Sequence, residues 1–137
     1  MQRILAIDYG TRRTGLAIAD RETHLPAPLE VFEGLTDQQL VEKITALIAR
    51  EGVSTVVCGM PLNMDDSVGP QAKKTQQFMA LLEQHAGLKV IGIDERLTTH
   101  DSESKLAGIY TRKQKRGRID AIAAARILQD YLDQSES

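Results

Sequence analysis

The sequence has few aromatic residues, a single cysteine and almost no net charge. Aromatic residues make up 4% of the 137 residues and tryptophan is absent, so stacking on exposed bases cannot be the main mode of any nucleic-acid binding. The net charge of −2 argues against a protein that is basic overall, so any contact with nucleic acid needs a local basic patch. Cys58 lacks a partner for an internal disulfide and lies in an apolar run, which indicates an intracellular protein with a buried thiol.

A basic-then-apolar leader and a long apolar span are missing as well. No stretch of the sequence is apolar for long enough to cross a bilayer, so we expect a cytoplasmic protein without a membrane partner. The length and the 42% apolar content suit one globular domain over residues 1–137, large enough to bury a core without staples. The polar tail after about residue 133 is expected to fray.

Hydrophobic patterning predicts three strands, followed by helices that alternate with two further strands. The first three strands, at 4–8, 14–20 and 28–32, have short links and should form an antiparallel meander, with the third at an edge because Pro28 opens it. The later elements are expected as helix 37–51, capped by Thr36 and stopped by Gly52, strand 53–60, helix 70–86, strand 88–93, a short helix from 98 or 99 to about 107, a polar basic segment over 108–117, and a helix from about 118. This order predicts an α/β, ribonuclease-H-like mixed five-stranded sheet, a three-strand antiparallel meander plus two parallel strands, with helices on both faces.

Acidic residues fall where the central strands of this sheet should end. Asp8 closes the first strand, and Asp94 and Glu95 close the last one. The carboxyl ends of such strands meet at one edge, where α/β sheets bind ligands, and Asp120 at the start of the last helix can reach the same edge. Carboxylates brought together repel one another unless a cation lies between them, and oxygen ligands favour Mg²⁺ or Mn²⁺.

These acidic residues have a catalytic interpretation and a structural one. Two hard ions about 4 Å apart can activate a water and stabilise the leaving oxygen of a phosphodiester; we take Glu95 as the ligand and Asp94 as its support. Each acid also has a structural interpretation: Asp8 can start a turn, Asp94 and Glu95 can simply end a strand, and Asp120 can favour the helix macrodipole. The three histidines share no spacing, which argues against a zinc site.

A basic run precedes Asp120. Residues 112–118 carry five positive charges, which is typical of a solvated face or a loop. Beside a metal site, the same run could instead hold a phosphate backbone. The candidate nucleic-acid contacts are Lys113, Lys115, Arg116 and Arg118, together with Arg12 and Arg13 in the turn after the first strand.

Four motifs in order along the chain resemble the YqgF family of Holliday-junction-resolvase-like proteins, whose members also carry the name "putative pre-16S rRNA nuclease". The resemblance runs essentially end to end and rests on the following segments: Asp8-Tyr9-Gly10-Thr11 with Gly15; 59–65, Gly-Met-Pro-Leu-Asn-Met-Asp; 94–99, Asp-Glu-Arg-Leu-Thr-Thr; and Asp120 with Ala123, Ala124, Ile127 and Leu128. Any one motif is weak, but four at family-like spacing are specific.

The resemblance implies a ribonuclease-H-like fold and divalent-metal nuclease chemistry. It carries catalytic and metal-binding roles onto Asp8, Glu95 and Asp120, with Gly10, Thr11 and Asn63 in matching motifs as supporting residues. It also implies maturation of the 5′ end of small-subunit ribosomal RNA, with Holliday-junction cleavage as the other activity. This chain has Asp66-Ser67 where the family usually has Gly-Thr, so we expect a reshaped loop there.

Two other functions compete with the nuclease. The turn after Asp8 also resembles the first phosphate loop of actin-like and sugar-kinase ATPases, but the chain has length for one domain only and lacks a Walker A ending. A non-catalytic nucleic-acid-binding protein of ribosome maturation or transcription stays open, because ligands without the right geometry look identical in sequence. Structured RNA is favoured over branched DNA as the partner, and a monomer and a homodimer both stay open.

Overall fold

The computed structural model of the chain describes residues 2–63, 65, 67–95 and 112–135, and within the last range the side chains of residues 119–134. This part of the chain contains a single five-stranded sheet in the order β3-β2-β1-β4-β5. Its strands are β1 (Arg3–Asp8), β2 (Arg13–Asp20), β3 (Ala27–Glu33), β4 (Val53–Met60) and β5 (Val90–Asp94).

The sheet has the predicted mixed topology. β1 pairs antiparallel with β2, which pairs antiparallel with β3. On its other side β1 pairs parallel with β4, and β4 pairs parallel with β5. The central position of β1 and the edge position of β3 are therefore confirmed. Because β1, β4 and β5 are parallel, their carboxyl ends lie at the same edge of the sheet.

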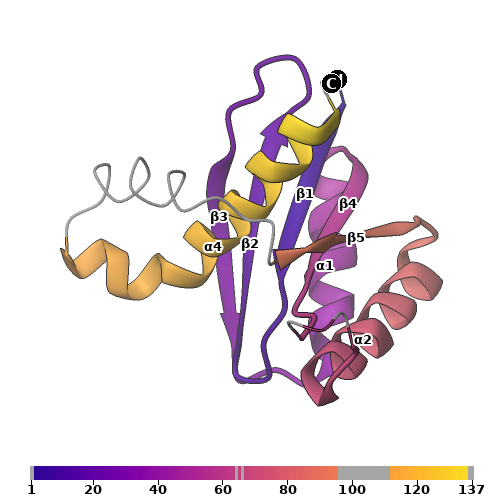
Figure 1. Cartoon of the computed structure of the whole chain (residues 1–137). Coiled ribbons are helices and arrows are strands. Elements are labelled where there is room, and N and C mark those ends of the chain that lie inside the picture. The colour runs from indigo at the N-terminus through magenta and orange to yellow at the C-terminus, as the bar shows by residue number, and fades with distance from the viewer. Residues whose placement is uncertain (1, 64, 66, 96–111, 136–137) are drawn as a thin grey trace.

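Two helices, α1 (Asp37–Glu51) and α2 (Pro70–Ala86), cover one face of the sheet (Figure 1). The capping box that Thr36 was predicted to form is present, and Gly52 ends α1 in the left-handed region at φ 66°. Helical periodicity in the sequence places five apolar side chains on one face of α1, and all of them are buried, namely Leu40, Val41, Ile44, Leu47 and Ile48. The sequence predicts that α2 buries Phe78, Leu81 and Leu82; Phe78 and Leu82 are buried, whereas Leu81 is only partly buried.

The helix α4 (Arg112–Ser135) crosses the other face of the sheet (Figure 1). Its buried side chains are small or aliphatic, and they pack on small residues of the sheet. Ala124 and Ala125 of α4 share a core cluster with Ala6, Ala17 and Ala19 of the strands. The small side chains of this alanine-rich helix therefore let it pack closely on the sheet.

The predicted start of this last helix was wrong. The sequence predicted a polar segment up to Gly117 and a helix from about Arg118, but α4 already begins at Arg112. Lysine, arginine and glutamine are good helix formers, and one glycine within a helix costs only about 1 kcal/mol relative to alanine. At the other end α4 continues to Ser135 and so includes the first residues of the tail that was expected to fray after about residue 133. The short helix expected up to about residue 107 lies outside the described residues.

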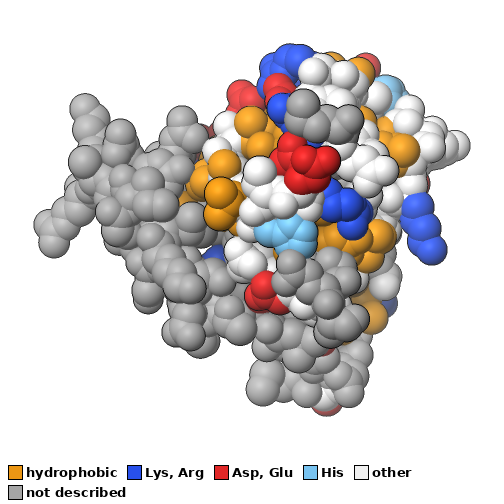
Figure 2. Space-filling model, turned by 90° about the horizontal axis from the view of Figure 1, so that it is seen from above, with side chains coloured by type: hydrophobic (Ala, Val, Ile, Leu, Met, Phe, Trp, Pro, Cys, Tyr) orange, Lys and Arg blue, Asp and Glu red, His pale blue; other side chains and the backbone are white. Residues whose placement is uncertain are grey.

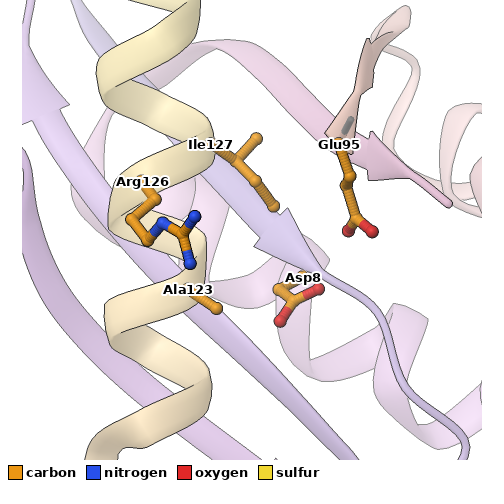
Figure 3. A pocket seen from close by; sticks show the side chains of 5 residues that line it. All are labelled: Asp8, Glu95, Ala123, Arg126 and Ile127. Atoms are coloured by element: carbon orange, nitrogen blue, oxygen red, sulfur yellow. The ribbon is translucent and has the colours of Figure 1, made fainter. Parts of the chain in front are cut away.

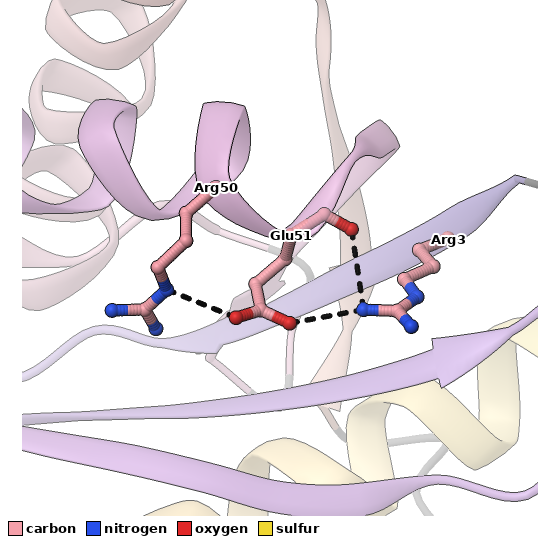
Figure 4. A network of polar contacts seen from close by, with 3 residues as sticks. All are labelled: Arg3, Arg50 and Glu51. Carbon is pink, nitrogen blue, oxygen red and sulfur yellow. Dashed lines mark hydrogen bonds and ion pairs between the residues drawn. The ribbon is translucent and has the colours of Figure 1, made fainter.

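Polar contacts at the opposite edge of the sheet tie α1 to β1. Arg3 Nη1 donates to Glu51 Oε1 at 2.9 Å and to the Glu51 carbonyl oxygen at 3.3 Å, while Arg50 Nε donates to Glu51 Oε2 at 2.9 Å (Figure 4). On the face seen in Figure 2, described side chains of both charge signs are interspersed rather than gathered into one patch. In the described part of the chain, no helix is long and apolar enough to span a membrane.

Candidate active site

Asp8 lies at the carboxyl end of the central strand. Side chains alternate between faces along a strand, and in β1 Ile4 and Ala6 face α4 whereas Leu5 and Ile7 face α1 and α2. The same alternation turns Asp8 toward α4, where it lines a pocket of about 200 Å³. A carboxylate is thus presented at the edge where the parallel strands end.

Tyr9 holds the turn that follows Asp8. Its ring stacks on Phe78 of α2, with ring centroids 4.4 Å apart and an interplanar angle of 15°. Its hydroxyl donates a 2.6 Å hydrogen bond to Asp37 in the first turn of α1. The strand end that carries Asp8 is therefore anchored to both helices of the other face.

Glu95 reaches Asp8 across the neighbouring strand. It directly follows β5, and β4 lies between β5 and β1. A Cβ atom on Gly59 of β4 would collide with the Glu95 carboxylate and with the Ile127 side chain. Because Gly59 leaves this space open, the carboxyls of Asp8 and Glu95 face the same cavity (Figure 3).

The environment favours a proton on this carboxyl pair. Burial raises the pKa of Asp8 to about 7, and the negative charges of Glu95 and Asp120 contribute to the rise. Burial also raises the pKa of Glu95, and the charge of Asp94 adds to that effect. The pocket therefore disfavours two negative charges on the pair, and a bound cation would relieve the same repulsion.

Asp120 lies near Asp8 but is held by Arg13. The Arg13 Nε and Asp120 Oδ2 atoms are 3.4 Å apart, and the two side chains are 51% and 27% exposed. The helix comes this close because a Cβ atom on Gly15, the β-partner of Asp8, would overlap the Asp120 backbone. Arg13, predicted to contact nucleic acid, is thus positioned first of all against a predicted metal ligand.

The predicted set of three ligands is not assembled as the side chains stand. Among the described residues, no group of three or more His, Cys, Asp or Glu side chains could hold a metal ion. Asp8 and Glu95 are together, and Asp120 is close enough to raise the pKa of Asp8. Metal binding by all three stays a prediction, which requires Asp120 to leave an ion pair that is long and half exposed to solvent.

Arg126 is the pocket residue that the sequence interpretation missed. It lines the pocket with Asp8, Glu95, Ala123 and Ile127, and its guanidinium lies on the pocket side of α4 (Figure 3). The signal was present, since Arg126 is the one charged residue in the run 121–128 and comes three residues after Ala123 of the predicted motif. A single positively charged residue in an otherwise apolar stretch of a helix indicates a functional residue.

The other predicted site residues lie outside this pocket lining. Thr11 and Arg12 are exposed in the turn after β1, where the Gly10 amide donates to Thr14 Oγ1 at 3.4 Å. Asp94 ends β5 beside Glu95 and acts on it through charge. Asn63 is exposed, and its side-chain amide donates to Ser67 Oγ at 3.0 Å.

The basic candidates of α4 have a helical backbone, but their side chains are not described. They are Lys113, Lys115, Arg116 and Arg118. In the loop after β4, the Ser67 hydroxyl and amide both donate to Asp65 Oδ1, at 2.6 and 3.0 Å. Asp66 lies outside the described residues, so the expected reshaping of that loop stays a prediction.

Comparison with known proteins identifies the family of this chain. A family model described as RuvX, Holliday junction resolvase, matches residues 2–134. A Chloroflexus aurantiacus protein named "Putative pre-16S rRNA nuclease" is 39% identical over 137 residues, covering 99% of this chain and 90% of its own length. A Halothermothrix orenii protein of the same name is 40% identical over 132 residues, covering 96% and 94%.

Two solved structures share the fold at low sequence identity. One is RuvC of T. thermophilus in complex with a Holliday junction substrate, at a TM-score of 0.63 and 13% identity, covering 98% of this chain and 96% of that one. The other is the Fowlpox virus resolvase with Holliday junction DNA, at a TM-score of 0.59 and 14% identity, covering 98% and 99%. These neighbours confirm the ribonuclease-H-like fold, and the family match together with the curated relatives shows that this chain belongs to the RuvX family, the YqgF family that its motifs resemble.

Proposed function

We propose that this chain is a divalent-metal-dependent nuclease that matures the 5′ end of pre-16S ribosomal RNA. The observation that carries the proposal is the carboxyl pair of Asp8 and Glu95, buried together at the carboxyl edge of the parallel strands. The family and the names of its curated members support a nuclease. Its substrate would place the protein in the cytoplasm.

The donor set of the pocket fits a hard cation. Asp8 and Glu95 offer only carboxylate oxygens, which Mg²⁺ and Mn²⁺ prefer, and two carboxyls in one pocket repel each other unless positive charge lies between them. We assign Asp8 and Glu95 as the ligands that hold the ion, with Asp120 completing the set once Arg13 releases it. When bound, such an ion activates a water and stabilises the leaving oxygen of the phosphodiester.

The remaining residues bind and orient the substrate. Arg12 and Arg13 lie in and after the turn that follows Asp8, beside the pocket edge. They can hold the phosphate backbone together with the basic residues at the start of α4, Lys113, Lys115, Arg116 and Arg118. The Tyr9 anchor keeps the strand end that carries Asp8 in place, and Asp94 precedes Glu95 at the end of β5.

Cleavage assays with carboxylate variants test the proposal. Asp8→Asn and Glu95→Gln should each lower cleavage of a pre-16S RNA substrate by at least about 10³-fold with Mg²⁺ or Mn²⁺, because each removes a charged ligand, while leaving RNA binding largely intact. Asp133→Asn, an exposed carboxylate on α4, is the matched control and should cleave like the parent. Variants that cleave like the parent with Mn²⁺ present would show that the site assignment is wrong.

A four-way DNA junction in the same assay separates the competing functions. Cleavage of the junction and not of the RNA would favour a resolvase, which the family description and the two structural neighbours keep as the second candidate. Cleavage of neither substrate with either metal would favour a non-catalytic accessory protein of ribosome maturation or transcription.

A further inference from the structure

Arg126 presents a permanent positive charge to the proposed metal site. Its side chain extends from α4 into the pocket that Asp8 and Glu95 line, and the adjoining wall is formed by Ala123 and Ile127 (Figure 3). A guanidinium stays charged at any physiological pH. Among the described residues that line the pocket, Arg126 is the only cation.

Arg13 and Arg126 occupy different positions relative to this pocket. Arg13 is paired with Asp120 and is half exposed, whereas Arg126 is partly buried and lines the pocket together with Asp8 and Glu95. The charge of Arg126 acts on both carboxyls, because all three side chains line one pocket of about 200 Å³ (Figure 3). In the metal-free protein it thus supplies part of the positive charge that the buried carboxyl pair needs.

We propose that Arg126 is the internal counter-cation of the Asp8–Glu95 pair and competes with the divalent ion for it. The inference rests on the proposed metal site. A divalent ion bound by the carboxylates would bring a second positive charge into the pocket that Arg126 lines, and the repulsion between the ion and the guanidinium carries an electrostatic cost. Arg126 therefore acts as a positioning residue that stabilises the empty site, weakens metal binding and sets the metal concentration at which the site fills.

Metal titration of two Arg126 variants is the direct test. Calorimetric titration with Mn²⁺ alone should give roughly tenfold tighter binding for Arg126→Gln than for the parent, since one opposing charge is removed from a partly buried site. Arg126→Lys keeps the charge and should stay within about threefold of the parent. Equal or weaker Mn²⁺ binding by Arg126→Gln, or equal tightening in Arg126→Lys, would overturn the proposal.

A surface arginine on another helix supplies the control. Arg50 of α1 pairs with Glu51 at the opposite edge of the sheet, and its side chain is 61% exposed (Figure 4). Arg50→Gln removes the same charge from the whole protein but leaves the pocket unchanged, so its Mn²⁺ affinity should equal that of the parent. A tenfold gain in this variant would assign the effect to net charge and overturn the proposal.

Unfolding without metal separates this inference from the proposed function. In chelator at pH 8, Arg126→Gln should lower the unfolding midpoint of the parent protein by about 3 to 6 °C. In the Asp8→Asn protein the same substitution should lower the midpoint by clearly less, because the negative charge of Asp8 that Arg126 neutralises is already removed. The same loss in both backgrounds would refute the counter-cation role. If Asp8→Asn instead binds Mn²⁺ as tightly as the parent, the proposed metal site fails, while the metal-free comparison still decides the role of Arg126.

Discussion

Asp8 combines a buried position with a negative charge, and the two conflict in the metal-free protein. Its carboxyl lies under α4 beside Glu95, and its pKa rises to about 7 from the usual 3.8. A raised pKa of an acid means that the folded chain binds a proton more tightly than the unfolded chain does. Stability is therefore lost as the pH rises from about 4 to 7, and the penalty is complete above pH 7.

Removing this charge should make the metal-free protein more stable. In chelator at pH 8 we expect Asp8→Asn to raise the free energy of unfolding by roughly 1 to 3 kcal/mol, below the upper limit of about 4 kcal/mol that a rise of three pKa units implies. The gain should shrink toward pH 4, where the parent carboxyl is protonated in the folded state. Urea unfolding at both pH values measures it, with Asp133→Asn as control; a gain that is the same at both pH values would contradict the account.

At the scale of the elements, two glycines open the space in which the carboxylates meet. Gly15 of β2 lets the backbone of α4 approach the sheet at Asp120, and Gly59 of β4 lets Glu95 pass toward Asp8. Both glycines are on strands that flank β1. The site therefore depends on the close contact between α4 and the sheet as much as on the acids themselves.

A methyl group at Gly15 should separate α4 from the sheet. Its Cβ atom would overlap backbone atoms of Asp120 and Ala121, which cannot rotate away, so we expect Gly15→Ala to destabilise the protein by about 2 to 3 kcal/mol and to lower cleavage. Gly92→Ala in β5 is the matched control, because its Cβ atom would meet only flexible side-chain atoms, Met60 Cγ at 3.1 Å and Met79 Cε at 3.6 Å. Thermal unfolding of both variants tests this; a Gly15→Ala protein as stable as the Gly92→Ala protein would contradict it.

At the scale of the whole molecule, the small net charge leaves nucleic-acid binding to a local surface. The chain carries a formal net charge of −2, so long-range attraction to a phosphate backbone is weak. The basic residues at the start of α4 follow one another on the helix that also carries Asp120 and Arg126. A nucleic-acid phosphate backbone bound to these residues would extend along α4 toward the pocket.

The salt dependence of RNA binding measures this contact. Changing Lys113, Lys115 and Arg116 together to glutamine should weaken binding and reduce the slope of log affinity against log salt by about 2, since each phosphate contact releases counterions. The matched control changes Lys43, Lys73 and Lys74, three exposed lysines of α1 and α2 on the other face. An unchanged slope in the Lys113, Lys115 and Arg116 variant would show that the basic run is an ordinary solvated face that does not contact phosphate.

Much of the fold could be predicted from local pattern alone. The alternation of apolar residues, the capping box at Thr36 and the stop at Gly52 specify elements through neighbours in the chain, and these were confirmed to within a few residues. The start of α4 was missed because residues 108–117 were interpreted as a polar basic segment before the helix, although lysine, arginine and glutamine favour a helix.

Sequence by itself determined the five strands, the central place of β1, the family and the three candidate acids. Tertiary structure alone decided that Glu95 meets Asp8 across Gly59, that Arg13 pairs with Asp120, and that Arg126 faces the carboxyl pair. These contacts join residues far apart in the chain, and they depend on how closely and at what angle α4 packs on the sheet. Local hydrophobic periodicity shows which side of a helix is buried, but not which charged group it brings to a given carboxylate.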